Sequence, residues 1–174
     1  VARHIPKSRP AGDRPTTRAS KKVLMLEGCV QPAMAPVINA AASRVLMQMG
    51  YEVVSTPTAG CCGAIDLHLG AEAEAKEAIR RNIDAWWPHV KAGDIEAIVM
   101  TASGCGVTVR DYHEILKDDV MYREKARQVS ELTRDLCEVI DPDRVEFNGA
   151  LEGVRIAFHS PCTLQHGQKI IGKV

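Results

Sequence analysis

The sequence predicts an α/β fold, a Rossmann-like parallel sheet with helices on both of its faces. Three short apolar runs, residues 23–27, 51–56 and 96–101, have the length and composition of buried strands, and segments with helical periodicity separate them. Buried strands that alternate with helices indicate parallel pairing, because a parallel connection needs a crossover that a helix supplies. At 174 residues, 45% of them hydrophobic, the chain can bury a core of its own.

Strand 23–27 is followed by a predicted helix. This helix opens at Pro32 and Pro36, carries apolar residues at helical spacing to about residue 49, and ends at Gly50. Proline is favoured in the first turn of a helix and glycine just after its last turn, so both ends have their usual residues.

Strand 51–56 leads through a loop to a longer helix rich in Ala and Glu. Its buried stripe is expected to include one of the two adjacent tryptophans, Trp86 or Trp87. Pro88 and Gly93 are expected to close it.

Strand 96–101 is followed by a helix that is expected to reach Leu116, and by another over residues 121–140 that ends before Pro142. A fourth strand is predicted at residues 154–158, with a helix starting after it. This segment has the same order of elements as the segment that starts at residue 23: a strand, a loop with a cysteine, and a helix. The internal repeat predicts that a second lobe begins in this region.

Three segments follow from this pattern: a basic linker or tail over residues 1–22, a first lobe over 23–150, and the start of a truncated second lobe over 151–174. The first segment holds seven Lys and Arg, one Asp and three Pro, so it cannot bury an apolar face. We interpret it as a solvated linker. Its charge could also contact anionic lipid, which would give peripheral association with a membrane.

Composition excludes several classes of function. Lys plus Arg and Asp plus Glu both number 22, so the chain has no global positive field to attract nucleic acid, and only 4% of residues are aromatic, so few side chains could stack on bases. No apolar run approaches the roughly 20 residues that span a bilayer. Without a signal peptide, the six cysteines are expected to be thiols of a cytoplasmic protein rather than a disulfide framework.

Cysteines follow each of the first three predicted strands. Cys29 follows the first strand, Cys61 and Cys62 the second, and Cys105 the third. Because the carboxyl ends of parallel strands meet at one edge of a sheet, four thiols are expected to converge in one crevice. Convergent thiolates are the ligands of an iron–sulfur cluster or of a zinc ion.

Other residues extend this predicted cofactor site. Gly63 and Gly104 lack a Cβ where the backbone would approach a ligand. Cys162 follows the fourth predicted strand as Cys29 follows the first, so it is expected at the edge of the site or farther away. Cys137 lies on the apolar stripe of a predicted helix and is expected to be a core residue.

Three other interpretations remain open at this level. The thiols could hold a structural zinc, which would leave the protein colourless. They could be incidental to a module that docks a partner protein. Cys61 and Cys62 could also act as a dithiol couple, although adjacent cysteines close a small strained ring.

The cysteine motifs also resemble a known family. The strings that carry the resemblance are Gly28-Cys29, Gly60-Cys61-Cys62-Gly63-Ala64, Thr101-Ala102-Ser103-Gly104-Cys105-Gly106 and Pro161-Cys162-Thr163-Leu164-Gln165-His166. They resemble the cysteine-rich CCG domain of the heterodisulfide reductase B subunit and, within that superfamily, the iron–sulfur subunits of bacterial glycolate oxidases.

The resemblance implies an electron-transfer component of an oxidoreductase complex, whose lobe alone would be inactive. Flavin-bearing subunits would oxidise a 2-hydroxy acid such as glycolate, and this subunit would pass electrons toward a quinone acceptor. It also implies a longer protein with a ferredoxin-like domain and two CCG lobes. Ala102 stands where the reductase pattern has a cysteine, so the implied group is an ordinary 4Fe–4S cluster on Cys29, Cys61, Cys62 and Cys105.

Overall fold

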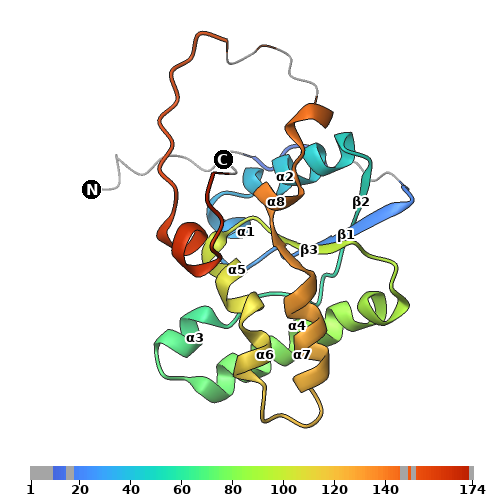
Figure 1. Ribbon diagram of the computed structural model, residues 1–174, viewed down its shortest axis with the longest axis vertical. Helices are drawn as coiled ribbons and strands as arrows, with labels where there is room; N and C mark the ends of the chain where they lie inside the picture. The colour runs from blue at the N-terminus through green and yellow to red at the C-terminus, as the bar shows by residue number, and fades with distance from the viewer. Residues whose placement is uncertain (1–9, 15–17, 146–148, 150–151, 173–174) are drawn as a thin grey trace.

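The computed structural model describes residues 10–14, 18–145, 149 and 152–172 (Figure 1). Its four strands form one parallel sheet in the order β2-β1-β3-β4. The strands are β1 (Lys21–Met25), β2 (Tyr51–Val54), β3 (Ala97–Met100) and β4 (Thr133–Asp135). The helices are α1 (Gln31–Met34), α2 (Val37–Gln48), α3 (Ala64–His68), α4 (Glu72–Ala92), α5 (Ser103–Arg110), α6 (Tyr112–Ile115), α7 (Arg123–Leu132) and α8 (Leu136–Val139), with short turns η2 (Pro142–Arg144) and η3 (Thr163–Gly167).

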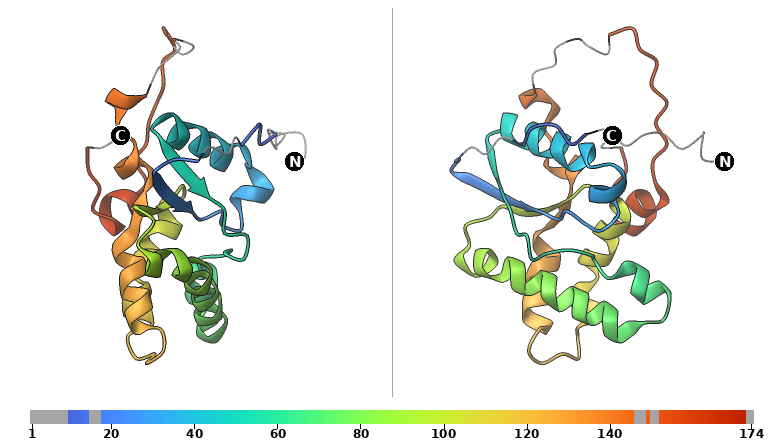
Figure 2. Two further views of the ribbon diagram at one scale, coloured as in Figure 1. Left: turned by 90° about the vertical axis from the view of Figure 1, so that its right-hand side faces the viewer. Right: turned by 180° about the vertical axis from the view of Figure 1, so that it is seen from behind.

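Helices cover both faces of the sheet, so the predicted α/β class is confirmed. Neighbouring residues of a strand point to opposite faces. Leu24 and Ile98 therefore pack in one core with α4, α5, α6 and α7, whereas Val23 and Val99 pack in a second core with α2 and α8. Figure 1 shows α2 and α8 above the sheet and α4, α6 and α7 below it, and Figure 2 gives the same arrangement from the side and from behind.

The long helix α4 continues past Pro88, so the prediction that this proline closes the helix is wrong. Proline lacks the N–H that would bond to the carbonyl of Asp84. Both residues are exposed, so that carbonyl lies on the solvent side and can bond to water. The helix ends instead at Gly93, which adopts a left-handed φ of 66°.

The continuous helix predicted over residues 121–140 is also wrong, because the strand β4 interrupts it. Thr133 is fully buried and pairs with Ile98 at the edge of the sheet. Asp135 then starts α8 with a capping box, in which its carboxylate accepts from the N–H of Cys137 and Glu138 accepts from the N–H of Asp135. An Asp followed three residues later by Glu is a sequence signal for such a helix start.

The strand predicted at residues 154–158 does not form in the structure. Val154, Ile156 and Phe158 are exposed, and no regular structure covers them. A strand is stable only beside another strand, and among the described residues the sheet ends at β4. The chain then returns to the domain, where η3 packs against α5, and both Leu164 of η3 and Ile170 after it are buried.

The basic segment is joined to the fold at its described residues. Strand β1 begins at Lys21, and Lys22 forms an ion pair of 2.9 Å with Asp94. Arg14 pairs with Glu27 just after the strand. Residues 1–9 and 15–17 lie outside the described residues. Among the helices of the described ranges, none has the length and apolar character to cross a bilayer.

Candidate functional site

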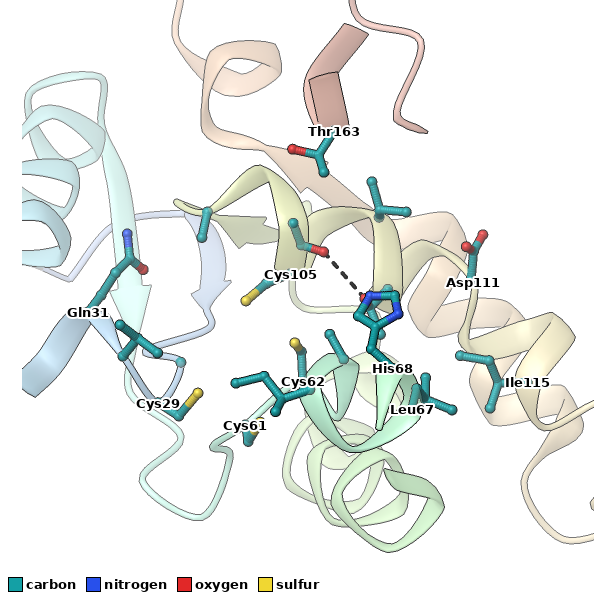
Figure 3. A pocket seen from close by; sticks show the side chains of 18 of the residues that line it. Cys29, Gln31, Cys61, Cys62, Leu67, His68, Cys105, Asp111, Ile115 and Thr163 are labelled. Carbon is teal, nitrogen blue, oxygen red and sulfur yellow. Dashed lines mark hydrogen bonds between the residues drawn. The ribbon is translucent and has the colours of Figure 1, made fainter. Parts of the chain in front are cut away.

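The four cysteines that follow β1, β2 and β3 line one cavity of about 940 Å³. Figure 3 shows Cys29, Cys61, Cys62 and Cys105 grouped at one end of this cavity, with Ile115 towards the other end. Most of the remaining lining is apolar and includes Val30, Ile65, Leu67 and Val107. The predicted convergence of the strand ends thus brings the thiols to a common, largely apolar space.

The order of the strands explains this convergence. Strand β1 lies between β2 and β3, so the three loops at their carboxyl ends are neighbours. Cys29 lies between β1 and α1, Cys61 and Cys62 precede α3, and Cys105 lies in the first turn of α5. Helix starts carry free N–H groups and a positive partial charge, both of which favour thiolate.

The thiols interact with one another in two pairs. The hydrogen bond to Cys105 is the main cause that raises the pKa of Cys62, and burial is the second cause. The same hydrogen bond lowers the pKa of Cys105. Of these two thiols, Cys105 therefore loses its proton more readily. Burial, and then the hydrogen bond to Cys61, raise the pKa of Cys29. A metal that binds here must displace protons, so its affinity increases with pH.

This donor set fits an iron–sulfur cluster. Four thiols from three loops surround one space with apolar walls, and such clusters are held by four cysteine thiolates. In the described part of the chain, no three Cys, His, Asp or Glu side chains are close enough together to hold one metal ion. A cluster of several irons takes its thiolates at a wider spacing than a single ion does.

Two buried side chains support the loop that carries the adjacent cysteines, and neither is predicted by the cysteine motifs. The side-chain amide of Asn82 donates to the carbonyl of Cys61 at 2.8 Å and accepts from the N–H of Gly60 at 2.8 Å. The hydroxyl of Tyr112 donates to the carbonyl of Cys62 at 2.9 Å. The signal for Asn82 is a polar residue within the apolar stripe of a helix, because such a residue needs a buried partner.

A second buried network supports the loop of Cys29. Asn39, which is fully buried, donates to the carbonyl of Glu27 at 2.9 Å and accepts from the hydroxyl of Thr101 at 2.7 Å. Gln31 donates to the carbonyl of Thr101 at 3.3 Å. These bonds join the loop after β1 to the loop after β3, and so connect the surroundings of Cys29 to those of Cys105.

The remaining predicted site residues take different places. Gly63 starts α3 just after the adjacent cysteines. Gly104 lines the cavity, and a Cβ there would meet no protein atom within 4 Å. Cys162 is exposed and does not line the cavity, although Thr163 next to it does. Cys137 is half-buried and borders a separate pocket beside α8.

Replacing Gly63 with alanine is expected to destabilise the protein more than the same change at Gly70. Both glycines have left-handed φ values, 87° and 78°, which cost other residues about 1–2 kcal/mol. Only the Cβ at Gly63 would also meet neighbours, at 3.1 Å from the carbonyl oxygen of Ala75 and 3.3 Å from Ile79. Such overpacking adds about 1–3 kcal/mol to the loss in free energy of unfolding.

Urea denaturation of the two variants checks this expectation. Equal losses for Gly63→Ala and Gly70→Ala would show that the loop before α3 shifts freely, contrary to the close packing of Gly63 on α4.

The sheet, the flanking helices and the converging cysteines define a cysteine-rich α/β domain. Residues 23–110, which include all four cysteines of the cavity, match the family model of the cysteine-rich domain CCG, and the chain belongs to this family.

Similar proteins include subunits that are named for iron–sulfur chemistry. The chain is 50% identical over 164 residues to the glycolate oxidase iron-sulfur subunit of Escherichia coli, a match that covers 94% of this chain and 40% of that protein. It is 30% identical to the probable glycolate oxidase iron-sulfur subunit of Bacillus subtilis, covering 93% of this chain and 37% of that protein.

Lactate utilization protein A of Bacillus subtilis is 24% identical, with 87% of this chain and 60% of that protein covered. The chain thus spans about 40% of the length of the two glycolate oxidase subunits. No solved structure matches the chain.

Proposed function

We propose that Cys29, Cys61, Cys62 and Cys105 hold a 4Fe–4S cluster, and that the protein transfers electrons within a flavin-linked 2-hydroxy acid oxidase that acts on glycolate. The observation that carries this proposal is the meeting of four thiols from three strand ends in one apolar cavity. The names of two relatives, both glycolate oxidase iron-sulfur subunits, support the substrate and the type of group.

The residues around the thiols suit a one-electron carrier. When bound, the cluster would accept and release single electrons. Apolar residues make up most of the cavity wall, Cys62 is buried, and the N–H of Gly63 lies 3.4 Å from the sulfur of Cys61. Hydrogen bonds to sulfur and limited solvent exposure are two of the means by which proteins adjust the potential of a cluster.

The partners follow from the same assignment. Flavin-bearing subunits of the complex would supply electrons, and a quinone would receive them. Because a quinone acceptor lies in the membrane, we place this protein in the cytoplasm, in contact with the membrane surface. The basic residues of segment 1–22 are suited to binding anionic lipid.

We also propose the three-part organisation: linker 1–22, first CCG lobe 23–150, and the start of a second lobe from residue 151. Val154, Ile156 and Phe158 are large apolar residues at alternate positions and are exposed, as expected for a strand whose partner strands lie elsewhere in the protein. The glycolate oxidase subunits extend well beyond the matched region, which leaves room for these strands.

Metal and sulfide analysis of anaerobically purified protein tests the cluster. We expect iron and acid-labile sulfide in equal amounts, with visible absorption that bleaches on reduction by dithionite. Zinc in place of iron, in a colourless protein without sulfide, would overturn the electron-transfer function and leave a structural metal site.

A further inference from the structure

We propose that Asn82 and Tyr112 are positioning residues that set the reduction potential of the cluster and slow its loss. The inference rests on the function proposed above. Neither side chain lines the cavity, and both are fully buried behind the loop of Cys61 and Cys62. They therefore act on the cluster through the backbone of these two ligands.

The two side chains form a closed network with that backbone. Asn82 donates to the carbonyl of Cys61 at 2.8 Å and to the hydroxyl of Tyr112 at 3.1 Å. That hydroxyl donates in turn to the carbonyl of Cys62 at 2.9 Å. The side-chain oxygen of Asn82 accepts from Gly60, so every polar group of the asparagine has a partner.

This network determines the direction of the peptide dipoles around the ligands. With the carbonyls of both cysteines held towards the core, the loop presents N–H groups to the sulfurs instead. The bond of 3.4 Å from the N–H of Gly63 to the sulfur of Cys61 is the direct example. N–H groups that face the sulfurs stabilise the extra negative charge of the reduced cluster and so raise its potential.

The hydroxyl of Tyr112 is suited to this role. Tyr112 accepts from the side-chain amide of Asn82 and donates to the carbonyl of Cys62, so it joins the asparagine to the cysteine loop. Its ring also packs in the core with α4 and α7, which provides a purely structural explanation for the residue. Removing only the hydroxyl separates the two roles, because phenylalanine keeps the ring.

The test compares Tyr112→Phe with Tyr122→Phe in the full chain. Tyr122 also loses one hydrogen bond, of 2.7 Å to Asp84, but it does not line the cavity or bond to the cysteine loop. Two quantities are measured: the reduction potential from an anaerobic titration followed by electron paramagnetic resonance, and the rate at which a chelator removes iron. The paramagnetic resonance signal of this cluster is identified as the one that is absent from a Cys105→Ser variant.

We expect a more negative potential and iron release about 10-fold faster for Tyr112→Phe, which is the low end of the effect of removing a supporting residue at a metal site. Tyr122→Phe should match the unmodified protein in both. A Tyr112→Phe protein with unchanged potential and unchanged release would overturn the inference even though the cluster is present. Unmodified protein without iron and sulfide at this site would instead overturn the proposed function on which the inference rests.

Discussion

Replacing Cys105 with serine is expected to remove the cluster, with a loss of about four irons per chain relative to the unmodified protein, the content of one 4Fe–4S cluster. Cys105 is the thiol whose pKa is lowered by the hydrogen bond from Cys62. It projects from the first turn of α5, which fixes its place in the cavity. A serine hydroxyl stays protonated at neutral pH and is a poor ligand for iron, so three thiolates would remain for a group that needs four.

The affinity for the cluster should fall by more than the roughly 10- to 100-fold that follows removal of a residue that only supports a ligand. Iron and sulfide analysis, together with the visible spectrum, measures it.

Cys137 provides the matched control. It is also half-buried and in the first turn of a helix, and burial together with Asp135 raises its pKa to about 12. It does not line the cavity of the four cysteines. Cys137→Ser should therefore retain its iron. Equal iron loss in both variants would indicate general unfolding, and full iron content in Cys105→Ser would exclude this residue as a ligand.

Replacing Trp86 with alanine is expected to lower the free energy of unfolding by about 3–5 kcal/mol, the usual cost of removing a large aromatic side chain from a core. Trp86 has 0% exposure and is among the largest fully buried side chains of the structure. It lies on α4 in the core that also contains Leu24 and Ile98 of the sheet. Its removal would leave a cavity between the helix and the sheet, and urea denaturation measures the loss.

Trp87 is the control for this change, because it has the same chemistry and the same helix. It is half-buried, and its ring lies 5.6 Å from the ammonium of Lys125. A cation–π contact of this kind contributes about 0.5–1 kcal/mol at an exposed site, so Trp87→Ala should cost far less. A similar loss for both variants would contradict the deeper burial of Trp86.

Helix α4 connects stability to the site. Trp86 and Asn82 are four residues apart, so they lie on the same side of the helix, one turn from each other. The tryptophan packs the helix against the sheet, and the asparagine donates a hydrogen bond to the loop of Cys61 and Cys62. We therefore expect the position of that loop to depend on the packing of the core.

The sequence by itself determined the fold class and the place of the four thiols. Runs such as 23–27 and 96–101 are apolar enough to be buried strands whatever surrounds them, and their spacing leaves room for helices only. Because parallel strands end at one edge of the sheet, the position of each cysteine in the chain was enough to predict that they meet. No contact between distant residues had to be known.

Only the tertiary structure decided the features that depend on a partner far away in the chain. Thr133–Asp135 is a strand because the chain places it beside β3, whereas residues 154–158, which are more apolar and better suited to a strand, pair with no strand in the described structure. Likewise, Trp86 rather than Trp87 is buried, and Asn82 meets Tyr112 across 30 positions of sequence. Hydrogen bonds and burial of this kind depend on which distant residues come close in space, and local sequence periodicity gives no information about that.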